Sequence, residues 1–266
     1  MRVTQIHPTA IVDPKAEIDP SVEIGPYVII EGPVRIGPRT KILAHAHLCG
    51  NTVIGADNEI HMGCVIGHTP QHLGYRGQPT GVRIGDGNVF REYVTIHRGS
   101  EEGSDTVVGD RCYFMAMSHI AHDAVVGNEI IVANGTLLAG HVHIEDKVVL
   151  SGNVGIHQHC RIGTLAMIGG LSKIVQDIPP YMLVDGSSKV CGINVVGLRR
   201  AGFDTATREK IKRAYKLLYR SNLNVSQALE AIEQELGDCP QIQHLIEFIR
   251  ASKRGIASHT PNRSDD

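Results

Sequence analysis

Histidines are concentrated in one stretch of the sequence, residues 118–162. An imidazole changes protonation state near neutral pH, so a histidine is the first candidate for a general acid or base. His122 is followed directly by Asp123, a carboxylate that could orient its ring and stabilise an imidazolium. The histidines of this stretch are His119, His122, His141, His143, His157 and His159. So many imidazoles in so short a stretch indicate a functional surface.

The elements that position these side chains follow from an aliphatic residue at every sixth position. Neither a helix nor an ordinary strand has that period, whereas a parallel β-helix does, with three six-residue units closing each coil. Residues two positions earlier also point inward and are mostly small, as a thin core requires. The series runs through Ile120, Val126, Val132, Leu138, Ile144, Leu150, Ile156 and Ile162. We therefore predict a mainly β fold, a left-handed parallel β-helix.

The six-residue count sets the limits of this domain. It runs back to Ile6 and lapses only in two segments, near residues 68–82 and 99–106, which we predict to be external loops. Loops that interrupt a solenoid usually lie on its working face. The count stops at Pro179-Pro180, so the β-helix domain is predicted over residues 1–180.

The rest of the chain changes character. Residues 181–257 are predicted to form a linker and a C-terminal α-helical domain, with an irregular link over 181–203 and three stretches of 3.6-residue periodicity after it. The tail, residues 258–266, is expected to be disordered.

With eighteen residues per coil, side chains stack in columns along one edge. His122, Gly140 and Gln158 share one column, and Asp123 shares the next with His141 and His159. Gly140 could offer an uncovered backbone N–H to an oxyanion while His122 acts as general base, a set that suits acyl transfer to a hydroxyl or an amine.

Two other interpretations of the histidines stay open. A zinc site made by His97, His119 and His122 would be similar to that of γ-class carbonic anhydrases, although the spacing differs from that family's histidine pair. The histidines could instead line a subunit interface without chemistry. A coil edge is convex and makes a poor pocket alone, so we expect a homotrimer with sites between subunits.

Composition excludes several classes of partner. The formal net charge of −2 and the pI near 6.7 give no reason to expect nucleic acid as a partner. There is no apolar span long enough to cross a membrane. The six cysteines show no close pairs, and reduced thiols fit a cytoplasmic protein.

Specific motifs resemble one family over nearly the whole chain. They are FREYVTIHRGS (90–100), SHIAHD (118–123), LAGHV (138–142), GIHQHC (155–160), QDIPPY (176–181), GINVVGLRRAGF (192–203) and AYKLLYRS (214–221). Together these are similar to the UDP-N-acetylglucosamine O-acyltransferases, which open lipid A biosynthesis. The resemblance implies transfer of an (R)-3-hydroxyacyl group from the phosphopantetheine of acyl carrier protein to the 3-hydroxyl of the nucleotide sugar, with no bound cofactor and no metal.

The resemblance also assigns roles to residues. His122 would be the general base, Asp123 its support and Gly140 the oxyanion donor. Asn194 and Arg200 would hold the uridine and phosphate part, Gly170 would limit the acyl pocket, and basic residues of the helical domain, Lys212, Arg213, Lys216 and Arg220, would suit an acidic carrier protein. The substrate-binding residues that it implies are Gln71, His72, His97, His119, His141, His157, Gln158, Gly170, Asn194 and Arg200.

Two departures from the family pattern bear on the acceptor. Where better-known members carry an acidic residue and then a lysine after the loop glutamine, this chain has His72 and Gly74 after Gln71. His159 stands where the family has an aromatic residue. A neutral histidine in place of a carboxylate could accommodate a 3-amino sugar, so N-acyl transfer to the 3-amino analogue of the acceptor is the alternative.

Overall fold

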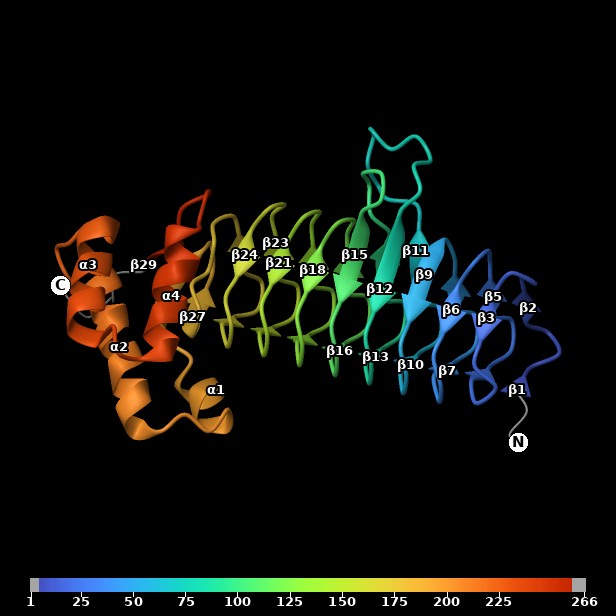
Figure 1. Cartoon of the computed structure of the whole chain (residues 1–266), viewed down its shortest axis with the longest axis horizontal. Coiled ribbons are helices and arrows are strands. Elements are labelled where there is room, and N and C mark those ends of the chain that lie inside the picture. Colours follow the sequence, from blue (N-terminus) through green and yellow to red (C-terminus); the bar gives the residue numbers. More distant parts are fainter. Residues whose placement is uncertain (1–4, 260–266) are drawn as a thin grey trace.

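The computed structural model describes residues 5–259. Successive strands, most of them two residues long, visit three sheets in turn, and these sheets, here called A, B and C, form the three faces of a prism (Figure 1). All strand pairs within the prism are parallel, and most pair with the strand eighteen residues further on, as Gln5 does with Glu23. The predicted parallel β-helix is confirmed.

The strands of the three faces are as follows. Sheet A contains β1 (Gln5–Ile6), β4 (Glu23–Ile24), β7 (Lys41–Ile42), β10 (Glu59–Ile60), β13 (Val89–Phe90), β16 (Tyr113–Phe114), β19 (Ile131–Val132), β22 (Val149–Leu150) and β25 (Met167–Ile168). Sheet B contains β2 (Ile11–Val12), β5 (Ile29–Ile30), β8 (His47–Leu48), β11 (Val65–His68), β14 (Thr95–His97), β17 (His119–Ile120), β20 (Leu137–Leu138), β23 (Gly155–Ile156) and β26 (Lys173–Ile174). Sheet C contains β3 (Glu17–Ile18), β6 (Arg35–Ile36), β9 (Asn51–Ile54), β12 (Gly81–Ile84), β15 (Asp105–Val108), β18 (Val125–Val126), β21 (His143–Ile144) and β24 (Arg161–Ile162).

The core of the prism is the aliphatic series itself. Over most of the coils the second residue of each short strand is fully buried, because alternation along a strand turns that side chain inward. Two coils use a larger residue, and there the rings of Phe90 and Phe114 stack with their centroids 5.1 Å apart. Burial of these side chains is the main force that holds one coil on the next.

Both external loops leave the prism at the same edge. One follows β11 and the other follows β14, so each interrupts a turn from sheet B to sheet C, and the two project side by side (Figure 1). The first loop makes Glu59 pair with Val89 and the second makes Val89 pair with Tyr113. These steps exceed eighteen by twelve and by six residues, so the hexapeptide phase survives each insertion.

Beyond the last coil the chain is more regular than its sequence suggests. The segment 181–203, predicted to be irregular, contains β27 (Met182–Asp185) and β28 (Lys189–Ile193), an antiparallel pair that extends sheet A. The helices are α1 (Val195–Arg200), α2 (Thr205–Tyr219), α3 (Val225–Leu236) and α4 (Pro240–Arg250). Asp204 caps α2 and Asn224 caps α3 through their side chains, which fixes where these helices begin.

The tail prediction is wrong for its first two residues. Ser258 and His259 form β29, which pairs with Lys189 and Val190 of β28 and so adds a twelfth strand to sheet A. Residues 260–266, the rest of the predicted disordered tail, lie outside the described residues. No helix of residues 5–259 is long and apolar enough to span a bilayer.

Candidate active site

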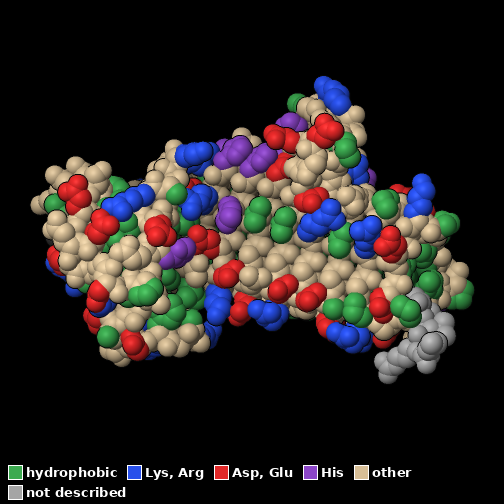
Figure 2. Space-filling view, viewed as in Figure 1, with side chains coloured by type: hydrophobic (Ala, Val, Ile, Leu, Met, Phe, Trp, Pro, Cys, Tyr) green, Lys and Arg blue, Asp and Glu red, His purple; other side chains and the backbone are tan. Residues whose placement is uncertain are grey.

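The edge between sheets B and C carries most of the predicted functional residues. Figure 2 shows histidine side chains gathered along one edge between the loops and the C-terminal helices. The third residue of each turn there has a left-handed backbone, with φ of 59° at Asp123, 59° at His141 and 63° at His159. Repeated turn geometry of this kind stacks equivalent side chains, and the rings of His141 and His159 lie parallel with centroids 4.6 Å apart.

His122 and Asp123 form a hydrogen-bonded pair. Nδ1 of His122 lies 2.7 Å from Oδ2 of Asp123. An ionised carboxylate only accepts hydrogen bonds, so Nδ1 carries the proton and Nε2 keeps its lone pair. This tautomer is the one that a general base requires.

Two serines of the second loop keep Asp123 ionised. The Ser100 hydroxyl donates to Oδ2 over 2.6 Å, and the Ser104 hydroxyl donates to Oδ1 over 2.5 Å. Burial alone would raise the pKa of this carboxyl, but the hydrogen bonds from Ser100, Ser104 and His122 outweigh it and lower the pKa to about 2.

The loops also cover His122. The rings of His72 and His122 meet edge to face with centroids 5.1 Å apart, and His122 retains only 8% of its exposure. On its other side His122 meets the ring of His141, at 5.3 Å. The His122 side chain therefore points out of the prism, as its position in the six-residue count predicts. The first loop shields it from bulk water.

Gly140 lies directly against the ring of His122. A Cβ atom placed on Gly140 would lie 2.5 Å from Cε1 of His122, closer than real side chains approach, so glycine is required for the ring to sit there. The backbone N–H of Gly140 donates no hydrogen bond to any residue among 5–259. An unpartnered N–H beside a base is what stabilisation of an oxyanion needs.

A groove of about 490 Å³ runs from this pair along sheet B. Aliphatic side chains such as Leu137, Ile156 and Ile174 line it, and Gly155 adds no side chain. Its polar rim contains the predicted residues Gln71, His119, His122, Gly140, His157 and Gln158.

Two predicted histidines, His97 and His119, lie side by side on sheet B, and His119 lines the groove. The rings of His97 and His119 meet at 4.9 Å, and Nδ1 of His119 lies 2.7 Å from the Thr95 hydroxyl. His97 is 7% exposed, its Nδ1 has no partner among the described residues, and burial together with neighbouring imidazoles lowers its pKa to about 4. His97 is therefore neutral at physiological pH.

Three predicted residues lie elsewhere. Gly170 is in the turn between sheets A and B, and Asn194 and Arg200 line a groove on sheet A beside Val149 and Met167. Asn194 caps α1 by accepting from the Gly197 N–H, and its amide nitrogen donates to the Leu165 carbonyl. A single chain does not bring these residues to His122, because the edge between sheets B and C lies opposite sheet A.

The residues able to hold a metal ion are not the predicted trio. Among the described residues, the set with suitably close ligand atoms is His122, Asp123 and His141, without His97 or His119. Both oxygens of this carboxylate already accept hydrogen bonds from the two loop serines.

Sequence reasoning missed Ser100 and Ser104. Serines are common in loops, and no periodic count relates a loop residue to a coil residue. The only available signal was the position of the second loop at the working edge, within reach of the turn that carries Asp123.

A base, an oxyanion donor and an aliphatic groove are what acyl transfer to a hydroxyl or amine needs, so fold and edge together indicate a hexapeptide-repeat acyltransferase. The model for bacterial transferase hexapeptide repeats matches residues 33–68, and that for domain 2 of UDP N-acetylglucosamine O-acyltransferase matches residues 177–257. The chain belongs to the UDP-N-acetylglucosamine O-acyltransferase family.

Relatives that match over nearly the whole chain support this assignment. The acyl-[acyl-carrier-protein]–UDP-N-acetylglucosamine O-acyltransferase of Syntrophobacter fumaroxidans is 48% identical over 95% of this chain and 99% of its own length. That of Thermodesulfovibrio yellowstonii is 49% identical over 96% of this chain and 99% of its own length. The structure of the Francisella novicida UDP-N-acetylglucosamine acyltransferase matches with a TM-score of 0.93 at 40% identity, covering 97% of this chain and 95% of that one.

Proposed function

We propose that this chain transfers an (R)-3-hydroxyacyl group from the phosphopantetheine of acyl carrier protein to the 3-hydroxyl of UDP-N-acetylglucosamine, the first step of lipid A biosynthesis. The observation that carries the proposal is the His122–Asp123 pair, which leaves Nε2 as a base beside the free N–H of Gly140. The donor brings its own activated thioester, so the reaction requires no bound cofactor. We place it in the cytoplasm, where acyl carrier protein and nucleotide sugars are available.

The chemistry follows from these two groups. Nε2 of His122 accepts the proton of the 3-hydroxyl while the oxygen attacks the thioester carbonyl carbon. The carbonyl oxygen gains negative charge and accepts a hydrogen bond from the Gly140 N–H. When the tetrahedral intermediate collapses, the C–S bond breaks and the thiolate takes the proton from the His122 imidazolium. Asp123 stabilises that imidazolium throughout.

We further propose that the site is completed by a second copy in a homotrimer. Arg200 lines a groove on sheet A, and His122 lies on the edge opposite sheet A. If each subunit directs that edge at sheet A of the next, three copies close a ring in which every site takes His122 from one subunit and Arg200 from another. The guanidinium then faces the acceptor's diphosphate, which it can bind bidentately.

A mixing experiment tests both proposals. His122→Ala and Arg200→Ala are each expected to be inactive alone in acylation of UDP-N-acetylglucosamine. In trimers assembled at random from an equimolar mixture of the two variants, about a quarter of the sites combine two intact residues, so activity should return to roughly that level. Restoration of no activity, with trimers confirmed by light scattering, would contradict the shared site.

The first loop supports a second candidate acceptor, the 3-amino analogue of the sugar. A Cβ on Gly74 would lie 2.8 Å from Cε1 of His72, and the Gly74 N–H approaches Nδ1 of His72 at 3.2 Å. The ring of His72 thus needs glycine at position 74, and it presents an imidazole to the acceptor side of His122 where family members carry a carboxylate. Competition between the two acceptors, measured as relative kcat/KM, decides between oxygen and nitrogen.

The carrier protein is expected to approach the helical domain. Of the four basic residues predicted to meet it, Lys212 pairs with Glu209 at 3.5 Å and Arg213 pairs with Glu235 at 2.9 Å. Lys216 lines a pocket between α2 and β28. The positive charge of the helical face is therefore partly neutralised within the chain.

A further inference from the structure

The first loop, residues 68–82, contributes two side chains to the site. Gln71 lines the groove along sheet B, and the ring of His72 meets that of His122 with centroids 5.1 Å apart. Gln71 and His72 are themselves exposed, so burial does not hold either of them in place. Their positions therefore depend on how the rest of the loop is fastened to the prism.

Tyr75 is the side chain around which this loop is folded. Of residues 71–79, only Tyr75 and Gln78 are partly buried. The Tyr75 N–H donates to the His72 carbonyl over 3.1 Å, and the Tyr75 hydroxyl donates to the Gln78 carbonyl over 2.9 Å. His72 is thus joined to Tyr75 by a single turn, and a contact that fixes Tyr75 also fixes His72.

Arg98 provides that contact from the prism. It directly follows β14, and its Nε donates to the Tyr75 hydroxyl over 3.1 Å. Its guanidinium carbon lies 5.6 Å from the centre of the Tyr75 ring, within the range of a cation–π interaction. The guanidinium also donates to the Gly67 carbonyl, just before the loop, over 3.2 Å. Arg98 forms no ion pair with a carboxylate of residues 5–259, so its charge is directed at the loop.

The surrounding backbone makes room for this side chain. Gly50 lies in an earlier turn of the same edge, and a Cβ atom there would lie 2.8 Å from Nη1 of Arg98 and displace the guanidinium. The Arg98 N–H donates to the His68 carbonyl over 3.2 Å, and the Gly103 N–H of the second loop donates to the Pro79 carbonyl of the first over 2.9 Å. Arg98 thus stands where both loops leave the prism.

We propose that Arg98 is a positioning residue for the acceptor, which acts by holding Tyr75 and so keeps Gln71 and His72 at the site. This inference rests on the proposed function, because those two loop side chains are expected to contact the nucleotide sugar. Arg98 does not line the groove, and the His122–Asp123 pair does not depend on it. Its loss should therefore weaken binding of the sugar more than it slows the chemistry.

Cleavage by trypsin reports on the loop directly. Arg76 is exposed, and its guanidinium donates to the Leu73 and Tyr75 carbonyls, which protects it from the protease while the loop is closed. Arg98→Gln is expected to speed cleavage after Arg76 about tenfold, because the open population of the loop rises when its contacts are lost. Mass spectrometry of the fragments identifies this cut. An unchanged rate of cleavage overturns the inference.

Steady-state kinetics tests the link from the loop to the site. Arg98→Gln should raise the KM for UDP-N-acetylglucosamine about tenfold, while kcat falls by about threefold at most. In a chain that already carries Gln71→Ala and His72→Ala, the same change should leave KM within about twofold, because Arg98 then has nothing to position. Equal increases of KM in both backgrounds, or a fall in kcat with KM unchanged, indicate a general structural role and overturn the inference.

Two further variants complete the test. Arg111→Gln, at an exposed arginine that pairs with Glu129 at 3.5 Å on the edge between sheets C and A, is the matched control and should keep the wild-type KM and cleavage rate. If Arg98→Gln does not fold, Tyr75→Leu breaks the same contact from the loop side and should reproduce both effects. Wild-type behaviour of Tyr75→Leu overturns the inference and leaves the proposed function standing. A wild-type chain that does not acylate the sugar contradicts the proposed function itself.

Discussion

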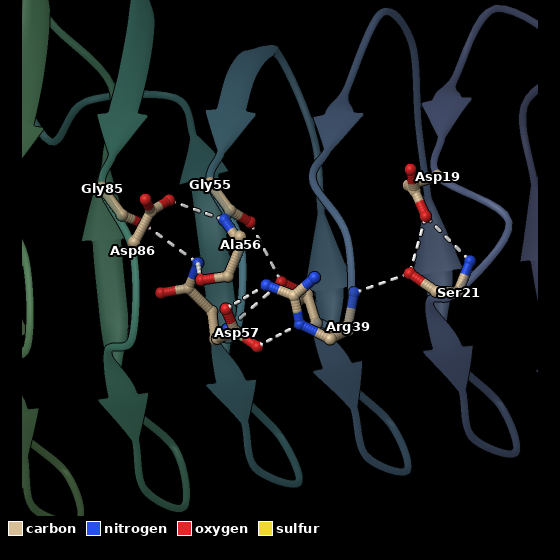
Figure 3. A network of polar contacts seen from close by, with 10 residues as sticks. Asp19, Ser21, Arg39, Gly55, Ala56, Asp57, Gly85 and Asp86 are labelled. Carbon is tan, nitrogen blue, oxygen red and sulfur yellow. Dashed lines mark hydrogen bonds and ion pairs between the residues drawn. The ribbon is translucent and has the colours of Figure 1, made fainter.

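Two edges of the prism share one turn geometry and use it differently. At the edge between sheets C and A the third turn residue is also left-handed, with φ of 57° at Asp57 and 56° at Glu129. There the side chains satisfy one another along the prism (Figure 3). The Ala56 N–H donates to Asp86 over 2.7 Å, and the Asp86 N–H donates to Asp110 over 2.8 Å. The ladder continues through Asn128 to Asp146.

At the edge between sheets B and C this ladder is missing. Among the described residues the side chain of Gln158, one coil further on, accepts no hydrogen bond from the Gly140 N–H, so this turn N–H is left free, and His122 keeps an unoccupied nitrogen beside it. The difference teaches that turn geometry alone does not mark a site. Chemistry is located where the polar groups of a repeated turn lack partners within the chain.

Removing the base should have the largest effect. His122→Ala is expected to lower kcat for acylation of UDP-N-acetylglucosamine by about 10²–10⁴-fold, because no other group takes the proton of the acceptor. Steady-state kinetics with acyl carrier protein as donor measures it.

His45→Ala is the control for a histidine in the same coil architecture. His45 is exposed in a turn between sheets A and B, where its ring stacks on Tyr27. It should leave kcat unchanged. Equal losses in the two variants would mean that imidazoles on this prism act through stability and would remove the distinction between its edges.

The sequence predicted the column of His122, Gly140 and Gln158 because coils beyond the second loop are eighteen residues long. His122, Gly140 and Gln158 therefore stack by simple counting, and the structure confirms that they share one groove rim. The same arithmetic fails across the loops, whose insertions make coil lengths of thirty and twenty-four residues.

Other features required coordinates for physical reasons. Ser104 reaches Asp123 from a loop whose backbone follows no repeat. The strand Ser258–His259 is held by backbone pairing with β28, which needs no apolar pattern and leaves none in the sequence. Asn194 and Arg200 lie on sheet A, away from His122, because the chain returns to that face after the last coil. No repeat in the sequence predicts which face it reaches.

Filling the space between Gly140 and the His122 ring should have the next largest effect on kcat. Gly140→Ala places a methyl group against His122, displacing the ring from the oxyanion donor, so kcat should fall about 10²-fold. Gly152→Ala is the matched control. Gly152 holds the equivalent turn position between sheets A and B, and a Cβ there would meet only the Asn134 carbonyl, at 3.5 Å. It should keep wild-type kcat. Comparable losses in both variants would show that the effect is general to the turn.

Weakening the hydrogen bonds to the Asp123 carboxylate should have a smaller effect on kcat. Ser104→Ala removes one hydrogen bond to Asp123 and should lower kcat about tenfold. Because the pKa of Asp123 is lowered in the folded chain, its ionised carboxylate stabilises the fold at pH values above its ordinary pKa of 3.8. This stabilisation is lost as the pH falls through about 2. In Ser104→Ala the pKa rises, so acid unfolding followed by circular dichroism should begin at higher pH. An unchanged pH midpoint of acid unfolding in Ser104→Ala would contradict the role of Ser104 in keeping Asp123 ionised.

The smallest effect is expected at the opposite edge, and it should appear in stability alone. Asp86→Ala removes the acceptor of the Ala56 N–H and should lower the free energy of unfolding by about 1 kcal/mol while kcat stays unchanged. Asp86→Asn keeps an acceptor oxygen, and Asn128 already fills the equivalent place in the ladder, so that variant should retain wild-type stability in urea titration. If Asp86→Asn is as unstable as Asp86→Ala, the charge of Asp86 and not its hydrogen bond supports the edge. The two edges would then differ in electrostatics and no longer in which polar groups are satisfied.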